Sequence, residues 1–375
     1  MKLFIALLVG ASLYFIQLFL YKRYWDRGLT VDIGFTEPVV REGDEDRLIE
    51  VIYNDKALPL PVVQIKFEIT RTFLFANRRN SAVTDRYYRN DHYSILPHQK
   101  ITRTYSFKCT KRGYYRMNGM DVICKDLFLS GMMLKSLTHE AAVCVLPGRL
   151  EGLAYEPKVR MLIGRITDRI RQNEDPFEFS GIREYQSYDP MNRINWKSSA
   201  SKGMLMVNKF DSSFSMKVTL CLNMECHIRW HEEEFMEEQI RIASTLAHEF
   251  IDRNIPVSLV SNGEDSVTKA PVFVEAGADK GHLRNMDIML ARIDAKNPGR
   301  DFVPMLEETV RNDRTRNTEY IIISNYRKKD LVEAYNGMKN RGLGVSWIIA
   351  EYQSADPLIM NTGDEDITKW TVRHV

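Results

Sequence analysis

The sequence contains few of the residues that build metal cages or disulfide frameworks. Its five cysteines are odd in number and scattered, and no two of them form a C-x-x-C pair. A zinc cage and a disulfide scaffold are therefore both disfavoured as organising features. Reduced thiols in a cytosolic compartment are the simpler interpretation.

Common catalytic signatures are also missing. The chain has no G-x-S-x-G, no P-loop and no G-x-G-x-x-G, which disfavours the hydrolase, nucleotide and dinucleotide sites that those motifs build. Cys226 and His227 are adjacent in the sequence. Neighbouring side chains point apart, so this pair does not suit a nucleophile and its base. No cofactor is predicted.

The sequence shows no excess charge of one sign. The net charge is +2 and 27% of the residues are charged, so no global field favours nucleic acid or an acidic substrate. The basic, aromatic run from Asn77 to Tyr93 could stack on nucleic-acid bases. Asp85 and Asp91 interrupt it, and the pattern favours a solvated hairpin. No nucleic-acid partner is predicted.

One long apolar run is present, at the amino terminus. Leu3 to Tyr21 is interrupted only by Ser12 and Gln17, and about nineteen residues at 1.5 Å each nearly cross a hydrocarbon core. A cleaved signal peptide is the alternative, but only Lys2 precedes the run and no small-x-small site follows it. The run therefore predicts a membrane anchor over residues 3–21.

The flank of this run predicts its orientation. Three basic residues and two interfacial aromatics follow it: Lys22, Arg23, Arg27, Tyr24 and Trp25. By the positive-inside rule this flank is cytoplasmic. We therefore expect a single-pass protein of the cell membrane, with residues 1–27 as the anchor and the bulk of the chain in the cytoplasm.

The next region is rich in strand patterns. Residues 47–54, 62–70, 101–109 and 120–124 alternate or run apolar and are rich in Val, Ile, Tyr and Phe. Turn signals such as Glu42-Gly43-Asp44 separate them. Short strands at this spacing predict an antiparallel β-sandwich over residues 28–150. Residues 151–211 then form a connector. Its first part is polar and basic, with a possible helix at 159–171, and its last part is the segment from Phe177 to Asp211.

The segment from Phe177 to Asp211 is unusual because charged and aromatic residues alternate densely in it. Asp189 before Pro190 predicts an N-cap and a first helical position, with a helix over 190–201 that ends at Gly203. Arg193 is then expected to pair with Asp189 or Glu184. Trp196 is expected to be a packed apolar anchor for this segment. A strand is expected over 204–210.

This segment also carries a family resemblance. It contains Gly181-Ile182-Arg183-Glu184-Tyr185, then Asp189, Arg193-Ile194-Asn195-Trp196-Lys197 and Ser199-Ala200. The run resembles the signature of the bacterial family catalogued as domain of unknown function 58. Two upstream elements fit it as well, Arg112-Gly113-Tyr114-Tyr115 and, in altered form, Asp126-Leu127-Phe128-Leu129-Ser130.

After Asp211 the hydrophobic period alternates between strand and helix. Strands are expected over 216–223, 256–261, 320–324 and 344–350, and helices over 232–253, 282–293, 302–310 and 328–340. Alternation of this kind predicts a parallel, doubly wound α/β domain over residues 212–375. This half resembles the von Willebrand factor A domain, which follows the signature in many members of the family.

That second resemblance points to a metal motif that has lost its charge. Such domains often bind a divalent cation through D-x-S-x-S after the first strand, where hard oxygen ligands suit Mg²⁺. Here the matching positions are Asn223, Glu225 and His227, and Asn325 stands where an Asp is expected after a later strand. Two carboxylates are thereby replaced, so we expect no metal. An isolated Glu-x-His is a weak metal signal by itself.

The resemblance implies an interaction protein. Family members commonly accompany MoxR-type AAA+ ATPases and transglutaminase-like membrane proteins, which implies a role in assembling or regulating envelope complexes. The rival hypothesis is a hydrolase or another enzyme that uses the charged signature residues. The interaction hypothesis assigns the surface to the following residues: Arg183, Glu184, Tyr185, Asp189, Arg193, Trp196 and Lys197.

Overall fold

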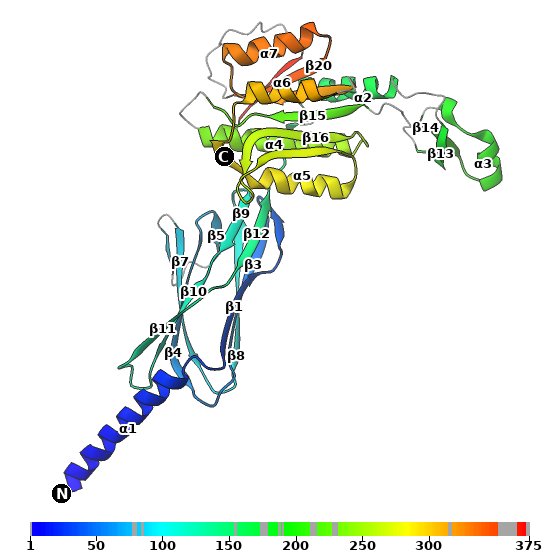
Figure 1. The fold of residues 1–375 in the computed structure, drawn as a ribbon. Helices are drawn as coiled ribbons and strands as arrows, with labels where there is room; N and C mark the ends of the chain where they lie inside the picture. The colour runs from blue at the N-terminus through cyan, green and yellow to red at the C-terminus, as the bar shows by residue number, and fades with distance from the viewer. Residues whose placement is uncertain are drawn as a thin grey trace. The chain divides into compact units, whose positions relative to one another are not determined.

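The computed structural model of the chain (Figure 1) describes residues 2–76, 81–83, 86–153, 156–172, 179–186, 189, 191–210, 216–226, 232–313, 317–351 and 366–372. The chain divides into two compact units, Met1–Gly148 and Arg149–Val375. The first contains one helix and a set of β-sheets and is called the β unit below. The second contains a sheet covered by helices and is called the α/β unit.

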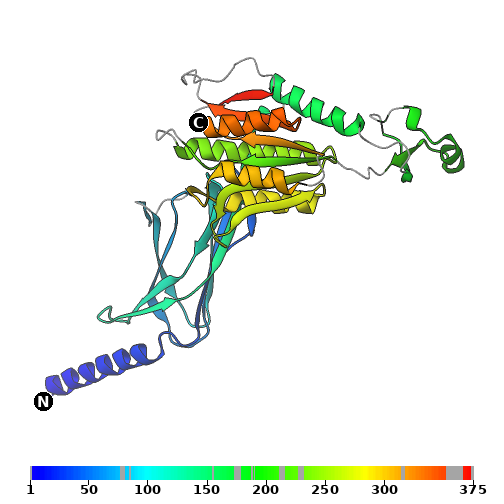
Figure 2. The same cartoon turned by 45° about the horizontal axis from the view of Figure 1, so that its top comes forward.

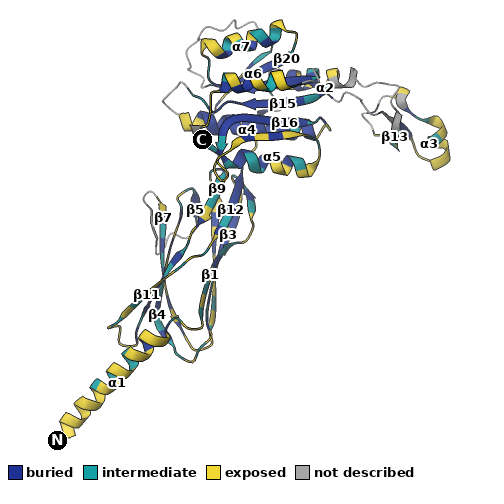
Figure 3. Ribbon diagram, viewed as in Figure 1, coloured by how far each residue is buried: buried dark blue, intermediate teal, exposed yellow. Residues whose placement is uncertain are grey.

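The β unit begins with helix α1, Lys2–Tyr24. It is long and apolar enough to cross a membrane, because its sequence is almost free of polar residues up to Lys22. Figure 3 shows it exposed along nearly its whole length. Its last turns differ, since Tyr21 and the following Trp25 are buried in the core of the β unit.

Antiparallel strands make up the rest of the β unit, as the sequence predicts. They are β1 (Leu29–Phe35), β2 (Val39–Arg41), β3 (Glu45–Asn54), β4 (Leu60–Thr70), β5 (Phe73–Phe75), β6 (Ser81–Val83), β7 (Arg86–Ile95), β8 (Lys100–Cys109), β9 (Gly113–Met117), β10 (Met120–Lys125), β11 (Met132–Leu137) and β12 (Ala141–Leu146). The sheet orders are β1-β3-β8-β5, β11-β10-β4-β7-β6 and β2-β12-β9. The β2–β12 pair is parallel.

The prediction of a solvated hairpin over residues 77–93 is wrong in one respect. Strands β6 and β7 do pair as a hairpin, but alternate residues of β7 are buried. Arg89 and Asp91 are among them, at 4% and 1% exposure, and the Arg89 Nε donates to Asp91 Oδ2 over 2.7 Å. Two charged side chains of opposite sign that pair with each other can occupy the buried positions of a strand.

A buried polar cluster extends from this pair to the other large sheet. Glu50 of β3 is fully buried, and its carboxylate accepts hydrogen bonds from the hydroxyls of Tyr93 and Tyr105. The Tyr105 hydroxyl also lies 3.1 Å from Asp91 Oδ2. Burial raises the pKa of Glu50, against the opposing effect of the two tyrosine hydrogen bonds.

The α/β unit alternates helices and strands. Its elements are α2 (Pro157–Gln172), β13 (Phe179–Glu184), the 3₁₀ turn η2 (Met191–Arg193), α3 (Trp196–Lys202), β14 (Met206–Phe210), β15 (Lys217–Leu222), α4 (Glu232–Ile251), β16 (Val257–Asp265), β17 (Pro271–Gly277), α5 (Lys280–Arg292), β18 (Ile293–Pro298), α6 (Phe302–Asn312), β19 (Thr318–Ile323), α7 (Lys329–Asn340), β20 (Gly344–Glu351) and β21 (Ile367–Thr371).

The main sheet has the order β17-β16-β15-β19-β20-β21. Strands β16, β15, β19, β20 and β21 are mutually parallel, whereas β17 runs antiparallel at one edge. The sequence pattern predicts none of the strands β17, β18 and β21. All three are short strands at or near the margins of the sheet, where fewer buried apolar residues mark a strand.

Helices cover both faces of this sheet (Figures 1 and 2). Successive strand residues point to opposite faces, so Leu220 joins the core beneath α2, α4 and α5, whereas Cys221 joins the core beneath α6 and α7. Both residues are fully buried. The near-continuous apolar sequence of β15 follows from this burial on two faces.

Candidate functional site

The signature residues fold into a small module, defined here as β13, η2, α3 and β14. Strands β13 and β14 pair antiparallel, with Arg183 opposite Val207 and Glu184 opposite Met206. Ile194 makes an isolated bridge to Val207. Ile194, Met206 and Val207 are 6%, 4% and 1% exposed, so they are among the apolar residues that the module buries.

The helix of this module begins later than the sequence predicts. Asn195, rather than Asp189, is the N-cap of α3, and its Oδ1 accepts from the backbone N of Ser198 over 2.9 Å. Residues Met191–Arg193 form a separate 3₁₀ turn. The end of the helix is as expected, because Gly203 adopts a left-handed conformation with φ of 66°.

Asp189 instead holds the turn after β13 in place. Both of its carboxylate oxygens accept from the Arg183 guanidinium, at 2.6 and 2.5 Å, and Oδ2 also accepts from the backbone N of Gln186 at 2.9 Å. Asp189 is 9% exposed. Arg183 is therefore its bidentate partner. The side chain of Arg193, which the sequence analysis expected in this role, lies outside the described residues.

Asn195 and Ser199 join α3 to the β13–β14 hairpin. The Asn195 Nδ2 donates to Asn208 Oδ1 over 2.7 Å. The Ser199 hydroxyl donates to the Asn195 carbonyl and accepts from the backbone N of Met206, each over 2.8 Å. Both residues lie in the signature motif, but the motif alone predicts no role for either. The preference for Asn at N-caps could have identified Asn195.

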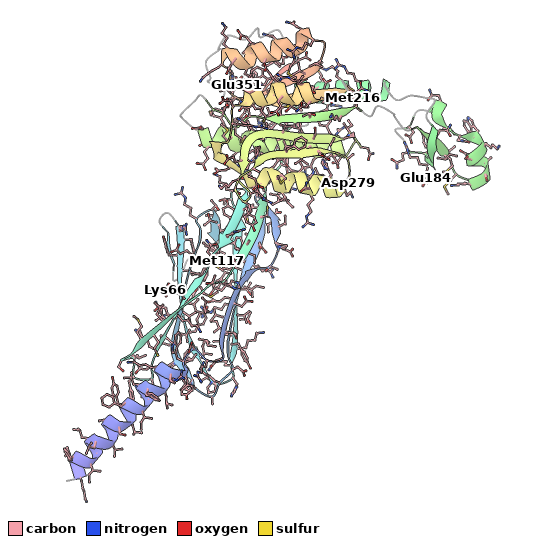
Figure 4. All side chains as sticks on the ribbon, in the orientation of Figure 1. Lys66, Met117, Glu184, Met216, Asp279 and Glu351 are labelled. Atoms are coloured by element: carbon pink, nitrogen blue, oxygen red, sulfur yellow. The ribbon has the colours of Figure 1, made fainter. Side chains whose placement is uncertain are left out.

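Trp196 does not pack as the sequence analysis expected. Its side chain is 67% exposed, and it stands at the first helical position of α3. Glu184 (labelled in Figure 4) and Lys197 are also exposed, and Tyr185 is half-buried. The polar residues Arg183, Asp189, Asn195 and Ser199 thus form the frame of the module, and Trp196 is presented on its surface.

Further apolar side chains share this exposure. Among the described residues of the α/β unit, eight large apolar side chains are exposed, and five of them belong to the signature segment: Ile182, Met191, Trp196, Met204 and Leu205. An apolar surface concentrated in this way is typical of a binding site rather than of a solvated face.

A second candidate site lies at the carboxyl ends of the parallel strands. Strands β15 and β19 are neighbours at the point where the order of the sheet reverses, which is where open α/β sheets bind ligands. Asn223 follows β15, and Ser324 and Asn325 follow β19. Asn262 comes from the neighbouring β16. All four are at most 1% exposed.

These side chains satisfy one another. The Asn223 Nδ2 donates to Ser324 Oγ over 3.0 Å, and its Oδ1 accepts from the backbone N of Glu225 over 2.8 Å and from Asn262 Nδ2 over 3.2 Å. From α4, the Gln239 amide donates to the carbonyls of Asn223 and Ile323, both at 3.1 Å. The edge of the sheet is therefore closed by neutral amides and a hydroxyl.

Glu225 points to a helix rather than into this network. Its Oε1 accepts from the backbone N of Phe302, the first residue of α6, over 2.8 Å. Burial raises the pKa of Glu225, against the opposing effect of this hydrogen bond. Asn325 donates from Nδ2 to the Cys226 Sγ over 3.2 Å. His227 lies outside the described residues.

The arrangement lacks the oxygen set that a hard cation needs. Within the described ranges, no three His, Cys, Asp or Glu side chains are grouped so that they could hold a metal ion. Carboxylates supply most of the charge in Mg²⁺ and Ca²⁺ sites, and here Glu225 is the one carboxylate among the predicted motif positions. The geometry supports a structural role for these amides.

Comparison with known families agrees with the signature. Residues 181–350 match the model of the family described as protein of unknown function DUF58. The resemblance of the signature to domain of unknown function 58 is thereby confirmed for this part of the chain. The match begins at Gly181 and ends at Ala350, so it spans the signature module and the sheet through β20. No curated protein matches the sequence.

Several solved structures show a weak likeness. The CARDB domain of the PF1109 protein from Pyrococcus furiosus, in complex with di-metal ions, is 15% identical with a TM-score of 0.22, over 32% of this chain and 90% of that one. A PapD-like domain of human CEP192 is 13% identical with a TM-score of 0.22, over 32% and 87%. A non-cellulosomal cohesin from Archaeoglobus fulgidus is 10% identical with a TM-score of 0.21, over 31% and 91%. Scores of this size carry no argument.

Proposed function

We propose that this DUF58 protein is a membrane-anchored interaction protein. In this proposal α1 crosses the cell membrane once, and the β unit and the α/β unit both lie in the cytoplasm. The chain works with a MoxR-type AAA+ ATPase in the assembly or regulation of envelope complexes. The family resemblance suggests the ATPase, and the apolar signature module suggests where it binds.

The exposed apolar surface of the signature module is the observation that carries this proposal. The ion pair of Arg183 with Asp189 and the cap at Asn195 hold the module in one conformation, so that an exposed Trp196 is preorganised for a partner. Tryptophan is enriched among the residues that dominate binding energy at protein interfaces. Lys197 and Lys202 are exposed on the same short helix, which favours a partner with an apolar groove and an acidic rim.

The α/β unit is the second part of the proposal. We infer that it is a domain of the von Willebrand factor A type in which the cation site has been replaced. The strand order with one antiparallel edge strand supports this, and so does the closed network around Asn223 at the edge where such domains hold their ion. The domain would then contribute a protein-binding surface without a metal.

A capture experiment tests the interaction. The full-length protein, purified in detergent, is immobilised and mixed with the MoxR-type ATPase of the same organism. We expect binding, and we expect Trp196→Ala to weaken it about 30-fold, which corresponds to an interface residue worth about 2 kcal/mol. Met161→Ala is the matched control, because Met161 is 74% exposed on α2, outside the module. Equal binding by both variants would contradict the assignment of the module.

A reporter fusion tests the orientation. The basic flank Lys22, Arg23 and Arg27 predicts that a reporter fused after Val375 is active only in the cytoplasm. Activity of a periplasmic reporter at that position, or a mature protein that starts after residue 21, would show that the anchor assignment is wrong.

A further inference from the structure

The turn between β10 and β11 carries an apolar surface that the proposed function does not use. Among the described residues 28–148, seven large apolar side chains are exposed, and five of them lie in or beside this turn: Leu127, Phe128, Leu129, Met132 and Leu134. Their exposed fractions run from 55% to 70%. The segment Leu127–Met132 is called the apolar turn below.

The apolar turn contacts α1 within the apolar run of that helix. The Tyr14 hydroxyl donates to Ser130 Oγ over 3.0 Å, and the Tyr14 ring lies 6.0 Å from the ring of Phe128. The Gln17 Nε2 donates to Asp126 Oδ2 over 2.9 Å. Tyr14 and Gln17 of α1 thus have hydrogen-bond partners in the apolar turn or directly before it. These bonds fix the position of the turn along the axis of the helix.

The length of α1 places this level inside a membrane. Tyr21 is 3% exposed and donates from its hydroxyl to the Pro59 carbonyl, so the helix has entered the β unit by that residue. Lys2 to Leu20 remain for the bilayer, about 28 Å of helix against a hydrocarbon core of about 30 Å. The whole segment from Lys2 to Leu20 is then needed for α1 to cross the bilayer. Tyr14 lies six residues before Leu20, about 9 Å deeper.

Several backbone groups in and beside the apolar turn are satisfied internally. The Asp126 Oδ1 accepts from the backbone N of Gly131 over 2.8 Å, and its Oδ2 accepts from the Ser130 hydroxyl over 2.7 Å. The backbone N of Leu129 donates to the Asp126 carbonyl over 3.0 Å, and the Asp126 N donates to the Gly131 carbonyl over 3.3 Å. Non-helical backbone can enter a membrane boundary only when its polar groups have partners of this kind.

Basic side chains flank the turn on the side of the β unit. Lys125 ends β10, and Lys135 lies in β11, where its Nζ contacts Asp26 Oδ2 at 2.9 Å. Lys22 and Arg23 end α1. A basic border above an apolar tip is the arrangement of segments that lie in the boundary between lipid headgroups and acyl chains, at a depth of about 5–10 Å.

We propose that the apolar turn Leu127–Met132 inserts into the lipid leaflet next to the carboxyl-terminal half of α1 and is a second membrane contact of this protein. Its partner is the bilayer itself, with acyl chains around Phe128 and anionic headgroups near Lys125 and Lys135. The contact would fix the tilt of the β unit on the membrane, because two points of attachment restrict rotation more than one. The inference rests on α1 spanning the membrane.

The depth of the turn can be measured with a fluorophore in the full-length protein. The parent carries Cys226→Ser, because the other four cysteines are buried and burial raises the pKa of the thiols of Cys109, Cys124 and Cys221 to about 12. An environment-sensitive label is then attached at Phe128→Cys, at Met132→Cys, and at the control Leu74→Cys, whose parent residue is 48% exposed on β5. The proteins are reconstituted into vesicles of phosphatidylcholine and the anionic lipid phosphatidylglycerol, with and without a nitroxide at carbon 5 of the acyl chain.

We expect the lipid nitroxide to quench the label at 128 and 132 at least about threefold more than at 74, as a depth of roughly 5–10 Å requires. Aqueous iodide should show the reverse order. Two results would overturn the inference: strong iodide quenching at both turn positions, which would place them in water, or protection from both quenchers, which would place them against protein. Resistance of the vesicle-bound protein to alkaline carbonate is measured in parallel. A protein that is released by carbonate refutes the membrane anchor itself, whereas a retained protein with an unquenched turn refutes only this inference.

Discussion

Replacing Trp196 by alanine separates a packed anchor from a presented binding residue. A fully buried tryptophan costs about 3–5 kcal/mol on truncation, because a cavity remains. Here the side chain is 67% exposed. A tryptophan buries 150–250 Å² when it is covered, so one third of that is roughly 50–80 Å², or about 1–2 kcal/mol at 25 cal/mol per Å². That value is an upper bound, because the unfolded chain also covers part of its apolar surface.

Native-state hydrogen exchange measures the loss of stability that Trp196→Ala causes within the signature module itself. The backbone N of Tyr185 donates to the Leu205 carbonyl over 2.9 Å and closes the β13–β14 pair, so its exchange reports the opening of the signature module. A loss of about 1 kcal/mol speeds exchange about fivefold, whereas 3 kcal/mol would speed it more than 100-fold. We expect the smaller change in Trp196→Ala.

Ile194→Ala is the matched reference for this measurement. Ile194 is 6% exposed in the same module, and its truncation should cost about 2–5 kcal/mol. If Trp196→Ala accelerated exchange as strongly as Ile194→Ala, the tryptophan ring would be packed and its assignment to a binding surface would be wrong. A loss of about 1 kcal/mol in Trp196→Ala together with about 30-fold weaker capture of the ATPase is the combination that the proposed function predicts.

Four further predictions follow from individual contacts. Arg183→Ala removes both guanidinium bonds from the nearly buried Asp189 and should cost about 2–3 kcal/mol of local stability. This is less than the cost of breaking a fully buried pair, because Arg183 is partly exposed. Hydrogen exchange at Tyr185 measures the loss, and a change below about 0.5 kcal/mol would contradict the assigned role of the ion pair. Asn195→Ala removes both the N-cap of α3 and the bond from Asn195 Nδ2 to Asn208, and it should cost about 1–2 kcal/mol by the same measurement. Asn195→Asp keeps the cap acceptor and loses the bond to Asn208, so it should cost less. Burial raises the pKa of Glu50, so the folded β unit keeps a proton that the unfolded chain releases near pH 4.5. The contribution of this proton to stability is present at low pH and is lost as the pH rises through the folded pKa. Glu50→Gln should remove this pH dependence from melting temperatures measured between pH 4 and 8, and identical pH profiles of the two proteins would refute the reasoning. Millimolar Mg²⁺ should leave the melting temperature unchanged, and a rise that disappears in Asn223→Ala would reveal a cation site.

Part of the order of elements could be predicted from the sequence, because that part depends on local pattern. The apolar run of α1, the alternating strands and the alternation of strand and helix after Asp211 each repeat with a fixed period. The period of the pattern alone decides which face of each element is apolar and therefore buried, without any contribution from distant residues. The short margin strands β17, β18 and β21 could not be predicted in this way, since their pairing with β16 or β20 supplies most of their definition.

The sequence by itself determined the likeness of residues 181–350 to DUF58, the apolar amino-terminal helix and the position of the signature, because these lie in contiguous runs of residues. Only the tertiary structure decided which signature residues form the frame and which face outward. Asp189 could pair with any of several nearby cations, and the β13–β14 pairing brought Arg183 to it. Trp196 is apolar and would be assigned to a core from composition, but the helix begins at this residue and leaves it exposed. Burial is a property of the folded neighbourhood, so no local pattern could have assigned it.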